Sequence, residues 1–282
     1  MTSPLVEWWP APAKLNLFLH VVGRRADSYH LLQTAFQFIE LCDQLRFEIT
    51  DDGSITRAID LADVPADRDL TIRAARLLKK TSGTSLGAHI ECIKNIPLGG
   101  GLGGGSSDAA TTLVALNHLW NTRLSLDQLA ALGLQLGADV PVFVRGHAAW
   151  AEGVGEQLTP IDPPEPWYVV IHPPCHVSTA EIFSLPELTR NTPPIKIRDF
   201  LAGSGSNTLE NVVRARYHAV SQALDWLGQF GSARMTGTGA CVFLGLPTQS
   251  QAREIASRAP ADWRVFVAKG LNRSPLRAQL GD

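Results

Sequence analysis

The segment 97–110 constrains this chain most, because six of the seven residues at 99–105 are glycines and Ser106 and Ser107 follow at once. Glycine has no Cβ, so successive main-chain N–H groups can turn toward a ligand. Apolar residues at helical spacing after Ser106 predict a helix, whose first turn adds unpaired N–H donors and the positive end of the peptide dipole. The segment therefore predicts an anion site, and a polyphosphate is the ligand that suits it best.

Two familiar phosphate-binding patterns do not fit this loop. The glycines contain G-x-G-x-x-G at 99–104, but a dinucleotide-binding fold needs a second parallel strand and an acidic residue about 20 residues on, whereas a second helical pattern follows here. A P-loop needs a lysine directly after its last glycine, and Ser106 stands there. Phosphoryl transfer develops negative charge, so the compensating charge must come from elsewhere in the chain or from a metal ion.

A lysine far from the loop in sequence is the candidate for this charge. Segment 11–22 alternates with period two, which predicts a strand that carries Lys14 and Asn16 on the same face. Both side chains can then meet one ligand. The alternative, which composition alone favours, is an ordinary solvent-exposed lysine on a half-buried strand.

Other polar residues also have two interpretations. Asp139 lies on a short connector and fits a catalytic role or a turn equally well. Ser106 and Ser107 fit helix capping without any ligand. Tyr29 and His30 fit a ligand site, or a packed aromatic residue and a turn histidine. Taken singly, none of these residues predicts a reaction.

Composition limits the function classes. The chain has 282 residues, of which 45% are apolar and 18% charged, and its formal net charge is −2. Without a basic field, nucleic acid is not an expected partner. The first ten residues lack the features of a signal peptide and no apolar run is long enough to span a bilayer, so we expect a soluble, cytoplasmic protein without a membrane partner. Four scattered cysteines without a CxxC pair predict reduced thiols and no metal site.

Periodicity and turn residues predict a mixture of strands and helices. Further strands are expected at 31–39, 44–50, 88–96, 167–171 and 264–268, with a glycine turn feeding a strand at 235–246; helices are expected at 70–80, from 106 onward, at 125–136, 207–229 and 249–258. Ser125 and Gln128 form a capping-box pattern. Glycines and prolines at 153–166 predict a boundary between two domains, 1–155 and 156–282. This order predicts an α+β protein.

Several motifs taken together resemble the GHMP kinase family. They lie at 12–16, 25–30, 97–110, 137–141, 235–243 and 269–276, so the resemblance extends over nearly the whole chain. It implies a two-domain α+β fold, with an ATP-binding N-terminal domain like ribosomal protein S5 and a ferredoxin-like C-terminal domain. It also implies phosphate transfer from ATP to the tertiary hydroxyl of a polyol linked to cytidine diphosphate, with Mg²⁺ expected and Ser106, Ser107 and Asp108 as the candidates for its protein ligand. The implied partners are small molecules, and the chain is expected to be a monomer or a homodimer.

The resemblance also implies roles for individual residues. Asp139 matches the catalytic base, and Lys14 matches the lysine beside it, which would stabilise the carboxylate and the transferring phosphoryl group. The nucleotide is expected to contact residues that match the phosphate loop and the segment before it: Lys94, Pro97, Leu98, Gly99, Gly100, Gly101, Leu102, Gly103, Gly104, Gly105, Ser106 and Ser107. The substrate is expected to contact Asn16, Tyr29, His30, Asp139, Thr179, Phe183, Gly237, Thr238 and Gly239. Among these, aromatic faces can stack on cytosine and His30 can bond its edge.

Two positions depart from the family pattern. Ser28 stands where glycine often precedes Tyr-His, and Asp69 stands where related chains often have an asparagine that contacts adenine. Three alternatives remain: another GHMP small-alcohol kinase of the mevalonate or homoserine type, a GHMP-fold protein that binds ligand without catalysis, and a dinucleotide oxidoreductase. Retention of both Lys14 and Asp139 argues against the second, and the helical pattern after the loop argues against the third.

Overall fold

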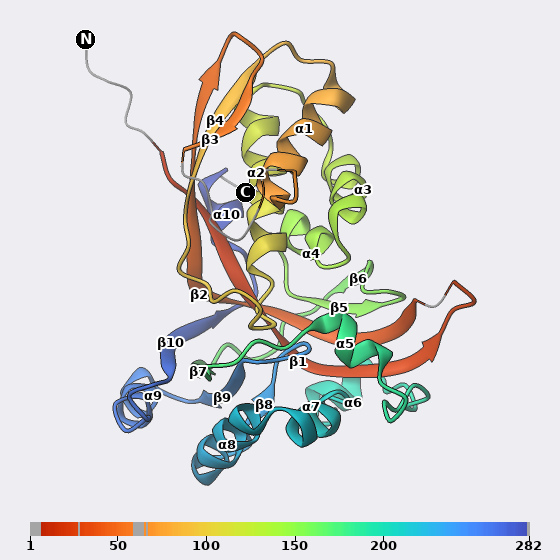
Figure 1. Cartoon of the computed structure of the whole chain (residues 1–282), viewed down its shortest axis with the longest axis vertical. Helices are drawn as coiled ribbons and strands as arrows, with labels where there is room; N and C mark the ends of the chain where they lie inside the picture. Colours follow the sequence, from red (N-terminus) through yellow and green to blue (C-terminus); the bar gives the residue numbers. More distant parts are fainter. Residues whose placement is uncertain (1–6, 28, 59–64, 66, 281–282) are drawn as a thin grey trace.

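The computed structural model describes residues 7–27, 29–58, 65 and 67–280; Ser28 and the N-terminal residues 1–6, on which two expectations rested, lie outside them. The first part of the described chain contains β1 (Trp9–Arg24), β2 (His30–Thr50), β3 (Ile55–Arg57), α1 (Leu70–Ser82), β4 (Gly87–Ile93), α2 (Gly104–Leu119), α3 (Leu126–Leu136), α4 (Val140–Arg145), β5 (Ala149–Glu152) and β6 (Gln157–Pro160). The second part contains β7 (Trp167–His172), α5 (Thr179–Ser184), α6 (Ile197–Leu201), α7 (Glu210–Arg216), α8 (His218–Leu227), a 3₁₀ turn (Gly228–Phe230), β8 (Arg234–Met235), β9 (Val242–Leu246), α9 (Gln249–Ala256), β10 (Arg264–Leu271) and α10 (Pro275–Gln279). In Figure 1 the first part lies above the second.

Strands β1 and β2 form a long antiparallel hairpin that extends through both parts of the molecule (Figure 1). The strand predicted at 11–22 is confirmed. The strands predicted at 31–39 and 44–50 are one continuous strand, because the residues between them stay paired, with Cys42 opposite Pro12 and Asp43 opposite Ala11. The alternating pattern predicted a half-exposed β1, yet every residue from 11 to 21 is buried. A second layer of chain therefore covers the polar face of β1.

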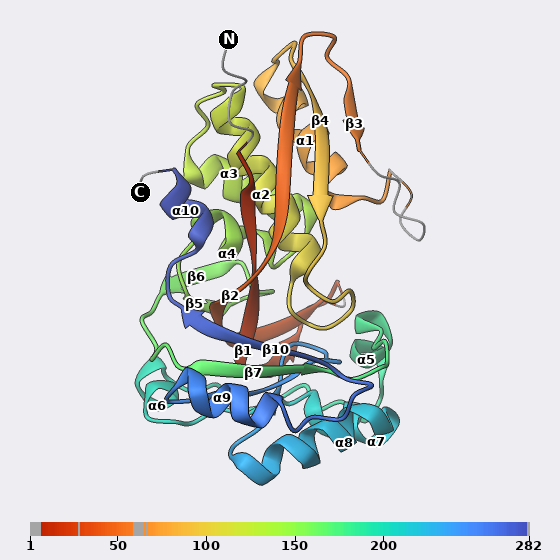
Figure 2. The same ribbon diagram turned by 90° about the vertical axis from the view of Figure 1, so that its left-hand side faces the viewer.

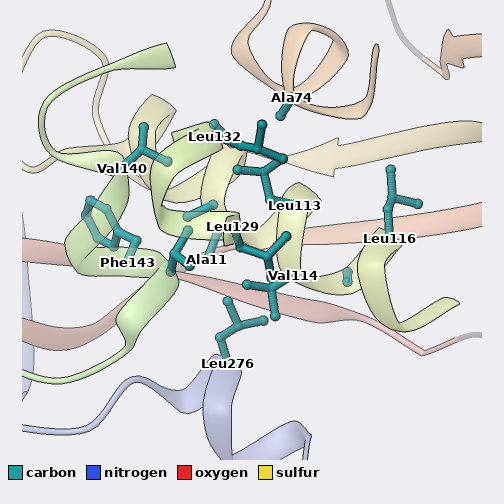
Figure 3. Packing of buried hydrophobic residues seen from close by; sticks show 14 of the residues in the cluster. Ala11, Ala74, Leu113, Val114, Leu116, Leu129, Leu132, Val140, Phe143 and Leu276 are labelled. Atoms are coloured by element: carbon teal, nitrogen blue, oxygen red, sulfur yellow. The ribbon is translucent and has the colours of Figure 1, made fainter. Parts of the chain in front are cut away.

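In the first part, α1 and α2 pack against one face of the sheet, and α3 and α4 pack in turn against α2, as Figures 1 and 2 show. Helix α2 is buried along most of its length, because its own side chains are small or apolar on all sides of the helix. Figure 3 shows its Leu113, Val114 and Leu116 among residues of the neighbouring helices and of β1. The capping box predicted at Ser125 and Gln128 is confirmed at the start of α3.

The second part has the order β7–α8–β8–β9–α9–β10, and its sheet has the strand order β10–β7–β9–β8 with all pairs antiparallel. Helices α8 and α9 cover one face of this sheet (Figure 2). The order and the pairing are those of a ferredoxin-like domain, so that prediction is confirmed. The single helix predicted at 207–229 is wrong: the chain breaks at Tyr217, whose φ of −117° and ψ of 88° are not helical, into α7 and α8.

The two parts are continuous with each other in space. Strand β10 pairs with β7 and also with β2, where Gly270 lies opposite Ile39, and the chain then returns to the first part, where Leu276 of α10 joins the core (Figure 3). The predicted division between residues 155 and 156 lies in the turn between β5 and β6, which pair with each other. The assignment of 1–155 and 156–282 to two domains stays a prediction.

Candidate active site

A cavity of about 860 Å³ lies between the two parts of the molecule, at the middle of β1. Its wall contains most of the predicted site residues: Lys14, Asn16, Tyr29, His30, residues 97–106, Asp139, Thr179, Phe183, Gly237 and Thr238. Lys94, Ser107 and Gly239 do not belong to the wall. The fold therefore brings together residues from six segments of the sequence at one hollow that could hold a small molecule.

The glycine loop forms one side of this cavity and needs glycine for two reasons. Gly99, Gly101 and Gly103 have φ values of 68°, 74° and 74°, in the left-handed region where a side chain is strained. The loop also lies directly against other chain segments, since a Cβ on Gly101 would be 2.3 Å from the carbonyl oxygen of Thr236. Because left-handed glycines alternate with other residues along the loop, successive main-chain N–H groups point toward the same side, which suits an anion.

Main-chain hydrogen bonds from both parts of the chain hold the loop. The N–H of Lys14 on β1 donates to the carbonyl oxygen of Leu102 at 2.9 Å, and the N–H of Cys241 donates to the carbonyl oxygen of Gly100 at 3.1 Å. Cys241, the donor of the second bond, closely follows the glycine turn 237–239, which the family resemblance assigned to this site. The loop is thus fixed in place before any ligand arrives.

Helix α2 begins directly at the loop. Its N-cap is Gly103, which makes no side-chain capping bond, and the first N–H bonded within the helix is that of Ser107, to Gly103 at 2.9 Å. The capping alternative for Ser106 and Ser107 is therefore wrong, because both lie inside the first turns. The N–H groups of Gly104, Gly105 and Ser106 precede the first helical bond and belong to cavity-lining residues.

Lys14 is the buried cation of the site, with only 3% of its surface exposed. Its Nζ donates to Oδ1 of Asn16 at 2.6 Å and to the carbonyl oxygen of Gly101 at 3.0 Å, and it lies 3.3 Å from Oδ2 of Asp139. The exposed-lysine interpretation is wrong because the glycine loop covers this face of β1. A buried ammonium with three fixed oxygen partners has a defined position, from which it can contact a phosphate bound at the loop.

Asp139 provides the carboxylate of the site. It occupies the N-cap position of α4, yet its side chain makes no capping bond and instead pairs with Lys14. Its side chain is 34% exposed toward the cavity that it lines, so a substrate hydroxyl can reach it. A carboxylate held by a cation beside an anion-binding loop can accept a proton from an attacking hydroxyl.

Asn16 connects β1, β2 and the second glycine turn. Its Nδ2 donates to the hydroxyl of Thr34 at 2.9 Å, and its N–H donates to the hydroxyl of Thr236 at 2.9 Å. Because Nδ2 is engaged and Oδ1 accepts from Lys14, the amide has one fixed orientation. Asn16 thereby holds the ammonium of Lys14 beside Asp139.

The opposite end of the cavity is aromatic. The rings of His30 and Phe183 are 4.9 Å apart between centroids, at an angle of 35°, and Tyr29 is 66% exposed beside them. Thr179 at the start of α5 bonds Thr238 through their hydroxyl oxygens at 2.9 Å. Flat rings with free faces can stack on a planar base.

Lys94 does not reach the cavity wall, because two buried carboxylates hold its ammonium. Its Nζ pairs with Asp43 and lies 2.5 Å from Oδ2 of Asp108, and these charges raise the pKa of Lys94. Burial, opposed by Lys94 and assisted by Asp43, raises the pKa of Asp108 to about 7. The second oxygen of Asp43 accepts the N–H groups of Asn95 and Ile96 at 2.6 and 2.8 Å. The cluster therefore joins the chain on both sides of the glycine loop.

Sequence reasoning missed Asp43, which fixes Lys94, and Arg190, which donates to His30, and it offered Asp108 only as a candidate ligand of Mg²⁺. An acid inside a strand and an acid on an apolar helix are sequence signals of paired, buried carboxylates, but their common partner Lys94 cannot be read from spacing. Asp69 stands where related chains often have an asparagine that contacts adenine, and here it has partners within the protein. Its oxygens cap α1 through the N–H of Thr71 at 2.9 Å and pair with Arg57 at 3.1 Å.

The described residues contain no group of three or more His, Cys, Asp and Glu side chains that could hold a metal ion, and none of their helices is long and apolar enough to cross a membrane. A magnesium ion bound mainly through substrate phosphates needs only one or two protein oxygens. The hydroxyl of Ser106 lines the cavity and meets that smaller requirement. The donor set thus fits an ion that arrives with a nucleotide.

Comparison with known families agrees with the fold and shows that it is the fold of a small-molecule kinase. The model of the GHMP kinases N terminal domain matches residues 69–147, and the model of the GHMP kinases C terminal domain matches residues 188–265. This chain belongs to the GHMP kinase family, whose members use ATP.

Individual relatives indicate which members of the family this chain closely resembles. The chain is 58% identical over 268 residues to a protein of Nitrosococcus oceani named 4-diphosphocytidyl-2-C-methyl-D-erythritol kinase, covering 95% of this chain and 96% of the relative. A crystal structure of 4-(cytidine 5′-diphospho)-2C-methyl-D-erythritol kinase superimposes with a TM-score of 0.81 at 32% identity, covering 94% of this chain and 99% of that one. Mevalonate kinase of Methanococcus jannaschii superimposes with a TM-score of 0.72 at 16% identity, covering 95% and 99%, which is a likeness of fold alone.

Proposed function

We propose that this protein transfers the terminal phosphate of ATP to the 2-hydroxyl of 4-(cytidine 5′-diphospho)-2-C-methyl-D-erythritol, a step in the non-mevalonate route to isoprenoid precursors. The observation that carries the proposal is the pair of Lys14 and Asp139, 3.3 Å apart, beside a glycine loop in a cavity that also contains an aromatic end. The names of the relatives supply the substrate class.

The reaction needs a base and a charge partner for the phosphoryl group. Asp139 accepts the proton of the substrate hydroxyl as its oxygen forms the new bond to the γ-phosphorus of ATP, and the bond from that phosphorus to the β-phosphate oxygen breaks to release ADP. Lys14 stabilises the carboxylate before transfer and the phosphoryl oxygens during it. Both groups stay in position because Asn16 and the carbonyl of Gly101 hold the ammonium.

The phosphates of ATP are held mainly by main-chain N–H groups. Residues 99–106 line the cavity, and the start of α2 at Gly104 adds the positive end of the helix dipole. Lys94 contributes indirectly, since its ammonium is fixed by Asp43 and Asp108 at the two ends of the loop. The direct nucleotide contact expected of Lys94 stays a prediction.

Magnesium is part of the proposal. Bound with ATP, the ion would neutralise the charge of the β- and γ-phosphates, and the hydroxyl of Ser106, which lines the cavity, would hold it. The cytoplasmic location, the absence of nucleic-acid partners and the monomeric or homodimeric state stay predictions.

Mevalonate and homoserine kinases share this fold at 16% and 18% identity, so the fold does not separate them from the proposed activity. The aromatic end of the cavity favours a substrate with a planar base, which mevalonate and homoserine do not have. A non-catalytic GHMP protein would have no need for the contact between Lys14 and Asp139.

The test is release of ADP, measured in a coupled assay with ATP, Mg²⁺ and the cytidyl erythritol substrate, with mevalonate and homoserine as matched controls. We expect turnover with the cytidyl erythritol substrate and none with mevalonate or homoserine. Equal or faster turnover with either control would refute the substrate assignment, and no turnover with any of the three would refute the kinase assignment.

A further inference from the structure

One side chain outside the cavity wall connects the ring of His30 to the main chain of the helix that carries Phe183. Arg190 donates from Nε to Nε2 of His30 at 3.0 Å. Its Nη2 donates to the carbonyl oxygens of Phe183 and Leu185 at 3.0 and 2.7 Å, and its Nη1 donates to that of Leu188 at 3.0 Å. A single guanidinium thus holds both the His30 ring and the end of α5 that carries Phe183.

The contact with Arg190 decides which nitrogen of His30 carries hydrogen. A guanidinium has only N–H donors and does not lose its proton in proteins, so its partner must be an acceptor. Nε2 of His30 is therefore unprotonated, and in the neutral ring the hydrogen lies on Nδ1. Nδ1 has no hydrogen-bond partner within the described part of the chain, and His30 lines the cavity, so this N–H is available to a ligand.

The surroundings of His30 also favour its neutral form. Burial lowers the pKa of His30, and the positive charges of Arg190 and Arg24 lower that pKa further. A protonated ring would place a hydrogen on Nε2 against a donor of Arg190. Charge and hydrogen-bond geometry consequently select the same state.

We propose that Arg190 fixes His30 as the Nδ1–H tautomer and thereby makes the aromatic end of the cavity select cytosine over uracil. The inference deepens the proposed function and rests on it for the identity of the base. Cytosine presents an unprotonated N3, which accepts the Nδ1–H of His30, whereas uracil carries hydrogen at N3 and places a donor against a donor. A site built to make a hydrogen bond rejects a ligand that leaves that bond unmade.

The same guanidinium explains why this selection is local. It ties His30, at the start of β2, to the main chain at the end of α5. The two elements that carry the edge-reading ring and the stacking ring, 4.9 Å apart between centroids, are thereby held together. Arg190 touches neither Lys14 nor Asp139 in the described structure. It is a positioning residue, and the reacting groups do not depend on it.

The tautomer can be measured on the full chain without any ligand. Long-range ¹H–¹⁵N spectra separate protonated from unprotonated imidazole nitrogens, and a His30→Gln spectrum identifies His30 among the eight histidines. At pH 7.5 we expect hydrogen on Nδ1 and an unprotonated Nε2. Hydrogen on Nε2, or a mixture of tautomers, would overturn the proposal.

Base selection is measured by titration calorimetry with CDP and with UDP. We expect the wild type to bind CDP at least about tenfold more tightly than UDP, the value of one hydrogen bond that is made or left unmade. In Arg190→Met this ratio should fall to near one and the tautomer should become mixed. Arg190→Lys keeps a donor-only cation and should retain most of the ratio.

The control is Arg198→Met, which removes the same charge from a side chain that is 78% exposed on α6. Its CDP to UDP ratio should equal that of the wild type. An unchanged ratio in Arg190→Met, or an equal loss in Arg198→Met, would contradict the role of Arg190. If Arg190→Met fails to fold, the wild-type tautomer and Arg190→Lys still decide the question. Absence of kinase activity together with the expected tautomer and ratio would refute the proposed function alone.

Discussion

The two ends of the cavity are built in different ways. At the phosphate end, Lys14 and Asn16 are each 3% exposed, and main-chain bonds from β1 and from residue 241 hold the glycine loop. At the base end, Tyr29 is 66% exposed, and contacts of one arginine side chain hold His30 and the end of α5. Backbone bonds preserve geometry whatever the side chains are, so the phosphate end suits chemistry shared by a family. Side-chain contacts change with single substitutions, so the base end suits selection of one substrate.

Replacing the buried ammonium should have the largest effect. We expect Lys14→Met to lower kcat about 10³-fold, because a charge aimed at the transferring phosphoryl group is lost, while the binding of CDP stays unchanged. Steady-state kinetics and calorimetry measure the two quantities. Lys80→Met, on the exposed side of α1, is the control and should have wild-type kcat. Weakened CDP binding in Lys14→Met would show that the two ends are not independent.

Removing the anchor of the loop should cost stability as well as nucleotide affinity. Asp43→Ala leaves Lys94 with one partner and the N–H groups of Asn95 and Ile96 without their acceptor, so we expect unfolding free energy to fall by about 3 kcal/mol. Chemical denaturation measures this, and KM for ATP should rise while that for the cytidyl substrate stays near its wild-type value. Asp225→Ala breaks an exposed ion pair and should cost under about 1 kcal/mol. Equal losses in the two variants would contradict the anchoring role.

The same cluster predicts a dependence of stability on pH. The pKa of Asp108 is raised by burial to about 7, above the value of an unfolded aspartate, so the folded state binds more protons than the unfolded state between about pH 4 and pH 7. Stability from this source is present below that range and is lost as the pH rises through it. Asp108→Asn should remove a decline of about 2 kcal/mol between pH 5 and pH 7, measured by denaturation at both values. An identical decline in the variant would contradict the buried titration.

The smallest effect should come from the exposed ring at the base end. Tyr29→Ala removes a stacking face, so we expect KM for the cytidyl substrate to rise about fivefold and KM for ATP to stay unchanged. Tyr29→Phe keeps the ring and should behave like the wild type. Equal changes in both Michaelis constants would separate Tyr29 from the base.

Periodicity and motifs predicted much of this molecule. The alternation at 11–22 placed Lys14 and Asn16 on one face of a strand, the order of elements predicted an α+β fold, and the family resemblance implied the ferredoxin-like part correctly. Burial of Lys14 could not be predicted, because the layer that covers it comes from residues about 90 and 220 positions away. The break at Tyr217 could not be predicted either, since no glycine or proline interrupts the helical pattern there.

Contacts between side chains of distant segments could not be predicted from the sequence. Asp43, Asp108 and Lys94 come from three different elements, and only the packing of β2, the end of β4 and α2 brings their charges together. Arg190 lies 160 positions from His30 and has the composition of an ordinary surface residue. Long-range pairs of this kind depend on the complete fold, whereas caps and strand faces depend on near neighbours.

The most direct test of the account is turnover and ATP binding by Asp139→Asn, measured on the same preparation. The amide retains the shape of the side chain but cannot accept the substrate proton, so kcat should fall about 10³-fold while the dissociation constant of ATP changes less than about threefold. Turnover at the wild-type rate would show that Asp139 is not the base, and the pairing of Lys14 with Asp139 would then not be the centre of the reaction.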